Sequence, residues 1–166
     1  YQNVYGPGQS LLNPYTGILS VFFTRILNNN DIDIYEDGMQ SRDFVYIDDV
    51  VDGTALAIEK NTNGNEVINI GSGVSTTVKD VACILKQSYK SDIKISISGH
   101  YRFGDIRHNF ADIIRAKRIL DFNPKFTFKE GVLHFTRWVK KQKIMQDNYD
   151  KSVDELKEKG LLKWVI

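Results

Sequence analysis

Three absences narrow the possibilities before any motif is considered. Cys83 is the only cysteine, so the chain cannot form an internal disulfide, which favours a reducing, cytoplasmic location. The three histidines are scattered and, with one cysteine, do not supply the ligands of a structural zinc cluster, so the sequence predicts no metal site. No apolar run approaches the ~18 residues that a membrane-spanning helix needs, so we expect no membrane partner.

Composition is typical of one globular domain. The chain has 166 residues, 42% hydrophobic and 26% charged, which is enough to bury a core. The net charge of +1 is unevenly distributed: residues 1–80 carry 4 Lys and Arg against 11 Asp and Glu, whereas residues 81–166 carry 18 against 10. Within one domain, we expect these two surfaces to complement each other. Because the basic residues are mixed with acidic ones, no nucleic-acid partner is predicted.

The first five residues, Tyr1-Gln2-Asn3-Val4-Tyr5, contain no Met, no charged leader and no signal-peptide core. They are typical of a strand that is already under way. We therefore interpret the chain as the back half of a longer protein.

Hydrophobic periodicity predicts alternating strands and helices. Strands are expected over residues 1–5, 32–35, 44–47, 67–70 and 93–97. Helices are expected near 15–28, from Asp48 or Asp49 to about residue 58, behind a Thr77/Asp80 capping box, after an Asp112 cap, over 132–139, and around 153–161. This alternation indicates an α/β fold, with a small mixed sheet and flanking helices.

The first candidate site is the segment Asn3 to Gln9. A strand that ends in Gly6-Pro7-Gly8 brings bare backbone close to another group, and ligands of α/β sheets bind at the carboxyl ends of strands. The alternative is simply a tight turn.

The second candidate runs from Tyr35 to Asp43. Tyr35 ends a strand, where an aromatic ring can stack on a base. Arg42 follows the turn, and a guanidinium is the natural bidentate partner of a phosphate. The alternative is that the Arg42–Asp43 region ties the loop to its own surface.

The third candidate runs from Tyr101 to His108 and contains Arg102, Asp105 and Arg107. Such a loop can hold an anionic group and a sugar hydroxyl together, although a solvated loop is the simpler interpretation. Gly71-Ser72-Gly73 resembles part of a phosphate loop, but no Lys-Ser/Thr pair follows it, so no Walker motif is present.

Taken together, these segments resemble the extended short-chain dehydrogenase/reductase family of nucleotide-sugar epimerases and dehydratases. The resemblance runs from Asn3 to about Lys141 and is nearest to UDP-glucose 4-epimerase-like and dTDP-rhamnose 4-epimerase-like proteins. Four segments carry it in order: Asn3 to Pro7, Gly38 to Asp49, Asn69 to Gly73, and Arg102-x-Gly104-Asp105. The resemblance implies the C-terminal, substrate-binding half of a Rossmann-type, NAD(P)-binding enzyme, with the last Rossmann strand at 1–5.

The front half of this family holds a glycine-rich NAD loop and a Tyr-x-x-x-Lys pair, and neither pattern occurs in the chain. The resemblance therefore implies that the catalytic residues lie upstream and that this chain alone is inactive. It divides the chain into a substrate-binding portion, residues 1–141, and a helical tail, residues 142–166, with no family site.

The resemblance also assigns roles to individual residues. The expected substrate contacts are Asn3 at the diphosphate or cofactor edge, Thr16 (or its neighbour Asn13), Tyr35 stacked on a uracil or thymine ring, Arg42 and Arg102 on the diphosphate, and Asp105 on the ribose hydroxyls. Tyr5, Gly6 and Pro7 match the loop beside the nicotinamide of NAD.

The resemblance thus implies an NAD-dependent nucleotide-sugar epimerase that acts on a UDP- or dTDP-sugar and forms a homodimer at full length. In that reaction NAD takes a hydride from C4 of the sugar and returns it after the sugar has turned. An NDP-sugar dehydratase or decarboxylase uses the same half, and a non-catalytic nucleotide-sugar-binding module is the alternative from a different class.

Overall fold

Strands and helices alternate along the chain, as the sequence predicts. The structure, a computed structural model, describes residues 1–11, 17–60, 65–143 and 146–164. The helices are α1 (Ile18–Leu27), α2 (Ile47–Glu59), α3 (Val78–Tyr89), α4 (Ile114–Leu120), α5 (Phe128–Val139) and α6 (Tyr149–Glu158). The strands are β1 (Asn3–Tyr5), β2 (Ile32–Ile34), β3 (Ser41–Arg42), β4 (Phe44–Tyr46), β5 (Thr76–Thr77), β6 (Ile95–Ile97), β7 (His100–Arg102), β8 (His108–Asn109) and β9 (Leu162–Trp164).

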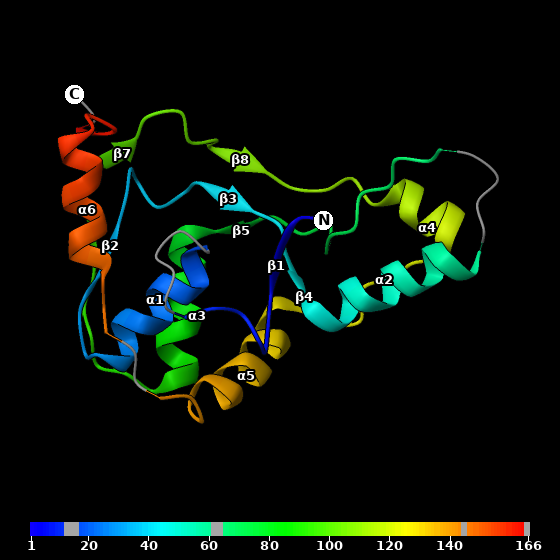
Figure 1. The fold of residues 1–166 in the computed structure, drawn as a ribbon, viewed down its shortest axis with the longest axis horizontal. Helices are drawn as coiled ribbons and strands as arrows, with labels where there is room; N and C mark the ends of the chain where they lie inside the picture. The colour runs from blue at the N-terminus through cyan, green and yellow to red at the C-terminus, as the bar shows by residue number, and fades with distance from the viewer. Residues whose placement is uncertain (12–16, 61–64, 144–145, 165–166) are drawn as a thin grey trace.

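The strands form small mixed sheets rather than one large sheet. β1 pairs with β4 and β2 pairs with β6, both in parallel, while β7 and β9 are antiparallel. β3 lies between β5 and β8 in a sheet of three. Figure 1 shows α2 and α4 at one end of the molecule, α6 and β7 at the other, and α1, α3 and α5 between them.

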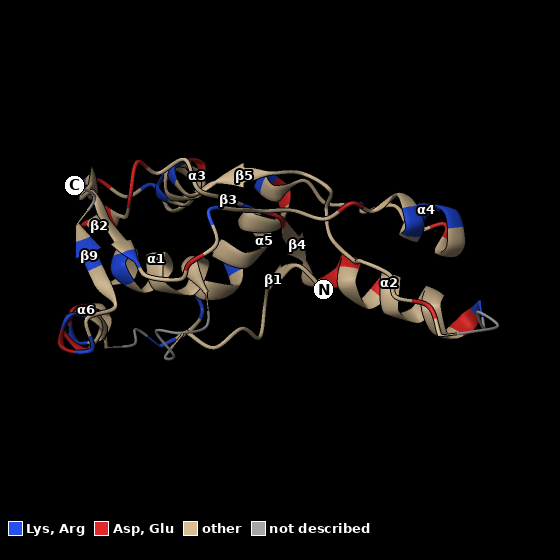
Figure 2. Cartoon of the chain, turned by 90° about the horizontal axis from the view of Figure 1, so that it is seen from above, with Lys and Arg blue, Asp and Glu red and all other residues tan. Residues whose placement is uncertain are grey.

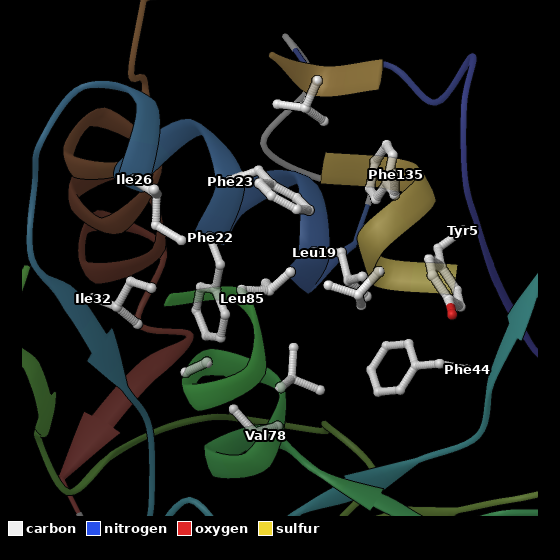
Figure 3. Close-up of a cluster of buried hydrophobic side chains, with 14 of the residues drawn as sticks. Tyr5, Leu19, Phe22, Phe23, Ile26, Ile32, Phe44, Val78, Leu85 and Phe135 are labelled. Carbon is white, nitrogen blue, oxygen red and sulfur yellow. The ribbon is translucent and has the colours of Figure 1, made fainter. Parts of the chain in front are cut away.

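Two hydrophobic clusters lie on opposite faces of β4. Phe44 and Tyr46 belong to the larger cluster, which α1, α3 and α5 complete, and Figure 3 shows Phe23 facing Phe135 inside it. Val45, between them, belongs to the smaller cluster of α2 and α4. All three residues are buried, which agrees with the near-continuous apolar run of a strand covered on both faces.

A buried carboxylate links three segments of backbone beside this strand. Asp43 is fully buried, and its oxygens accept hydrogen bonds from the Ser72 and Gly73 amides (both 2.8 Å), the Ser72 hydroxyl (2.6 Å) and the Ala111 amide (3.2 Å). A Cβ on Gly71 would lie 2.6 Å from the Asp43 carboxylate, so a glycine is needed there. The Gly71-Ser72-Gly73 turn therefore encloses a carboxylate of the protein itself.

Basic residues from the second half of the chain form ion pairs with acidic residues from the first half, as expected. Arg115 lies against Glu66 and Lys125 against Asp52, so basic residues around α4 meet acidic residues around α2. Figure 2 shows these two elements side by side, with acidic residues on α2 and basic residues on α4. No helix in the described ranges is long and apolar enough to cross a membrane.

The expected start of α2 is wrong in detail. Tyr46 is its N-cap, and Asp48 and Asp49 lie in the first turn. Asp49 is buried because its carboxylate accepts the amides of Lys125 (2.8 Å) and Phe126 (3.2 Å), so it holds a distant loop instead of capping its own helix.

Other departures occur where pairing partners decide the structure. Residues 67–70 form no strand, and the Gln2 amide, just before β1, donates to the Ile70 carbonyl. The cap of α4 is Ile113, although the Asp112 carboxylate accepts the Ile114 amide at 2.8 Å. Leu161, expected in the last helix, precedes β9, a strand that periodicity does not predict.

Candidate functional site

A cavity of about 770 Å³ lies between α1, the ends of β1 and β2, and α6. Its lining includes most of the substrate contacts expected from the sequence, although these come from separate segments: Asn3, Tyr35, Arg42, Arg102 and Asp105. Thr16, and Asn13 beside it, lie outside the described residues. The structure thus brings five expected contacts to one cavity.

Arg42 is held firmly at the edge of this cavity. Its guanidinium donates to the main-chain oxygens of Ser41 (2.9 Å) and Arg107 (3.0 Å) and pairs with the Asp105 carboxylate at 3.0 Å. The two interpretations of Arg42, a loop tie and an anion contact, are therefore compatible, because the loop bonds fix the group where the cavity opens.

Arg102, by contrast, has a guanidinium that pairs with no group in the described part of the chain. It ends β7, lines the cavity and is exposed. In the described ranges no hydrogen bond or ion pair occupies its guanidinium, so this group can donate to an anion in the cavity.

The third arginine of the loop is neutralised by its neighbours. Arg107 contacts Glu36 and pairs with Asp37 at 2.6 Å. The hydrogen bond from Arg107 lowers the pKa of Asp37, and the same bond raises the pKa of Arg107. These contacts join the loop after β2 to the loop after β7, and sequence reasoning did not predict them.

Tyr35 is half-buried at the end of β2, as its expected stacking role requires. Its ring is edge-on to that of His100, with centroids 6.4 Å apart. Its carbonyl accepts from the Gln40 side chain at 2.8 Å, and its hydroxyl accepts from the Tyr149 hydroxyl at 3.4 Å. Burial raises the pKa of the Tyr149 hydroxyl.

Asn3 lines the cavity from β1, and its side-chain amide donates to the Asp43 carbonyl at 3.2 Å. That bond uses one donor of the amide and leaves its oxygen and second N–H for other partners.

The segment expected beside a nicotinamide lies apart from the cavity lining. Tyr5 is 2% exposed, and its hydroxyl donates to the Phe128 carbonyl at 3.2 Å. Burial raises the pKa of Tyr5, so its phenol stays neutral. Gly6 is buried against Ile47, while Pro7 is exposed. Of these three residues, Pro7 is the one that presents surface to a ligand.

Sequence reasoning missed one wall of the cavity. It is made by the half-buried side of α6, whose lining residues are Tyr149, Ser152, Val153 and Leu156. Their spacing gives one face of a helix. This periodicity is visible in the sequence, but the surface that it covers is more than 100 residues away along the chain.

Comparison with known proteins places these features in context. Residues 1–71 match the model of the NAD dependent epimerase/dehydratase family. The chain is 36% identical over 138 residues to dTDP-L-rhamnose 4-epimerase of Burkholderia thailandensis, which covers 83% of this chain and 38% of that protein. It is 31% identical over 144 residues to UDP-N-acetyl-alpha-D-glucosaminuronate decarboxylase of Bacillus cytotoxicus, covering 83% of this chain and 44% of that one.

Among solved structures, UDP-glucose 4-epimerase of Thermotoga maritima with UDP-glucose superimposes with a TM-score of 0.75 and 37% identity, over 85% of this chain and 44% of that chain. The chain therefore spans about two fifths of the length of the relatives that it matches.

Proposed function

Because the chain belongs to the NAD dependent epimerase/dehydratase family, we propose that it binds the nucleoside-diphosphate part of a UDP- or dTDP-sugar. The observation that carries this proposal is the convergence of Asn3, Tyr35, Arg42, Arg102 and Asp105 on one cavity. These residues span about a hundred positions of sequence, so their meeting is not a consequence of local structure.

The volume of the cavity and its two arginines support this ligand class. Small-molecule sites commonly occupy ~300–1,000 Å³, and this cavity of about 770 Å³ falls in that range. The proposed diphosphate lies between Arg42, already oriented by carbonyl groups, and the uncommitted Arg102. Charge-assisted hydrogen bonds of this kind contribute ~1.5–3 kcal/mol each.

Asp105 and Tyr35 complete the proposed arrangement. The Asp105 side chain is 48% exposed, so its Oδ2, the oxygen that Arg42 does not contact, can accept from a ribose hydroxyl. The Tyr35 ring supplies a flat face for the base.

For the whole protein, we propose an NAD-dependent nucleotide-sugar epimerase. The described residues fit a dinucleotide only at its edge, through Pro7, because Tyr5 and Gly6 are turned into the core. NAD supplies hydride transfer when it is bound, and no residue described here takes part in that step. Inactivity of the chain alone, a cytoplasmic location and a homodimeric full-length protein remain predictions.

A decarboxylation is the second candidate reaction for the whole protein. The matched relatives include a decarboxylase as well as epimerases. The diphosphate site proposed here serves either reaction, because it contacts the nucleotide and not the reacting carbon. A non-catalytic nucleotide-sugar-binding module uses the same contacts.

The direct test is calorimetric titration of UDP and dTDP into the wild-type chain and the variants Arg42→Ala and Arg102→Ala. We expect each variant to bind ~10-fold more weakly or worse, a loss of ~1.4 kcal/mol or more. Arg118→Ala, which removes an exposed arginine on α4, is the matched control and should bind as the wild type does. If both cavity variants retain full affinity, the diphosphate assignment is wrong and these arginines only tie down their loops.

A further inference from the structure

The first half of the C-terminal segment, residues 146–164, contributes to the cavity through α6. Tyr149, Val153 and Leu156 of α6 line the cavity and repeat at helical spacing. No residue of α6 is fully buried. These side chains therefore keep apolar surface that a ligand in the cavity can cover.

The start of α6 is anchored to α1. Arg25 at the end of α1 pairs with Asp147 at 3.2 Å and Asp150 at 3.1 Å, and its guanidinium lies 4.7 Å from the centre of the Tyr149 ring. Asn30 adds a hydrogen bond to Asp147 at 2.8 Å. The Asp147 side chain is only 9% exposed, so this is not a solvent-screened surface pair of little value.

β9, after α6, holds the strand that carries Arg102. Leu162 lies opposite Arg102 in the antiparallel pair, and the Phe103 amide donates to the Leu161 carbonyl at 2.8 Å. The rings of Trp164 and His100 have centroids 3.8 Å apart. Figure 1 shows α6 beside β2 and β7, at the same end of the molecule as the C-terminus.

Both parts of the segment converge on Tyr35. The Tyr149 hydroxyl donates to its hydroxyl, and His100, which contacts Trp164, lies edge-on to its ring. A ring that is held from two sides presents one fixed face, and such preorganisation favours a flat ligand by reducing the ordering cost of binding.

We propose that α6 forms the second wall of the slot that receives the pyrimidine base, and that Tyr149 is a specificity-determining residue that positions Tyr35. Tyr35, Val153 and Leu156 all line the cavity, and in this proposal Tyr35 forms one side of the slot and the two aliphatic side chains form the other. A slot whose width is set by Tyr149 admits a single-ring base more readily than a two-ring purine. This inference rests on the proposed nucleoside-diphosphate site.

The test compares UDP, ADP and inorganic pyrophosphate by calorimetry on the wild-type chain and on Tyr149→Ala and Tyr149→Phe. We expect Tyr149→Ala to bind UDP ~10-fold more weakly than the wild type and to show a smaller ratio of UDP to ADP affinity. Its affinity for pyrophosphate should stay within ~2-fold of the wild-type value. Tyr149→Phe keeps the ring and should weaken UDP by only ~3-fold, since it removes a single hydroxyl contact. Tyr1→Ala, at an exposed tyrosine far along the chain, is the matched control.

One further variant keeps the outcomes separate. Leu156→Ser changes the wall without touching Tyr35, and it should show the same selective loss of UDP if Tyr149→Ala fails to fold. If Tyr149→Ala loses affinity for UDP and pyrophosphate equally, or if its ratio of UDP to ADP affinity is unchanged, the proposed role of Tyr149 is wrong. The proposed nucleotide site is not contradicted by that result. A wild-type chain that binds none of the three ligands would overturn the proposed function, and this inference with it.

Discussion

Replacing the buried carboxylate of Asp43 with an amide should destabilise the fold strongly. Each Asp43 oxygen accepts two hydrogen bonds: Oδ1 from the amide and hydroxyl of Ser72, and Oδ2 from the amides of Gly73 and Ala111. In Asp43→Asn one oxygen becomes an NH₂ group, which donates. An NH₂ turned toward Gly73 and Ala111 leaves both of their amides without an acceptor, whereas an NH₂ turned toward Ser72 leaves only the Ser72 amide without one, because the Ser72 hydroxyl can rotate and accept. At ~1–3 kcal/mol for an unsatisfied donor, even the less costly orientation should lower the free energy of unfolding by ~1–3 kcal/mol.

This loss is large against the ~5–15 kcal/mol that stabilises a typical domain. Urea unfolding followed by tryptophan fluorescence measures it directly. Asp92→Asn, at an exposed position, is the control and should change stability by less than ~0.5 kcal/mol. Ser72→Ala removes one of the four donors, and its loss in the free energy of unfolding should lie between those of Asp92→Asn and Asp43→Asn, at ~1 kcal/mol. If Asp43→Asn is as stable as Asp92→Asn, the four-bond account of this carboxylate is refuted.

Two further predictions concern α5. A Cβ at Gly131 would meet the Tyr5 hydroxyl and the Tyr46 ring, so Gly131→Ala should lower the melting temperature, because overpacking that costs ~1–3 kcal/mol outweighs the gain in helix propensity. The control is Lys129→Ala, on the exposed side of the helix, which should leave the melting temperature unchanged. An unchanged melting temperature for Gly131→Ala would contradict this packing. Hydrogen bonds from Thr127 lower the pKa of Glu130 below its ordinary value of 4.5, so this stabilisation is complete above that value and is lost as pH falls through the lower, folded-state pKa. Urea unfolding between neutral and acidic pH should therefore show a shallower acid loss for Glu130→Gln than for the wild type, and parallel curves would count against the capping box.

Sequence reasoning was most successful where the information is local. The Thr77/Asp80 cap is confirmed, with the Thr77 hydroxyl accepting the Asp80 amide at 3.0 Å, because all of its atoms lie within one turn. Helix positions likewise follow from periodicity within one continuous segment. Strands β3, β5 and β8 have two residues each, too few for any alternation to be recognised.

In the candidate site, too, the residues that belong to local motifs were predicted, and those placed by distant contacts were not. Tyr35, Arg42, Arg102 and Asp105 belong to short motifs that can be recognised by order and spacing, and the structure places them on one cavity. Tyr149 belongs to no such motif, and its contact with Tyr35 joins positions 114 residues apart. Apolar residues of α2 do not all face the core: Val51 is 58% exposed and Ile58 76%, because α4 covers the other side of that helix.

Adjacent residues of one motif serve the fold and the proposed site separately. Successive side chains of an extended segment point to opposite sides, so Asp43 is directed into the protein while Arg42 reaches the cavity. The Arg42 guanidinium is oriented by the Ser41 and Arg107 carbonyls and by Asp105, while the Asp43 network fixes the backbone next to it. Ser72 belongs to that network and Leu156 to α6, so their substitutions should have nearly additive effects on nucleotide affinity. Strong coupling between Ser72→Ala and Leu156→Ser in nucleotide binding would mean that the cavity responds as one unit.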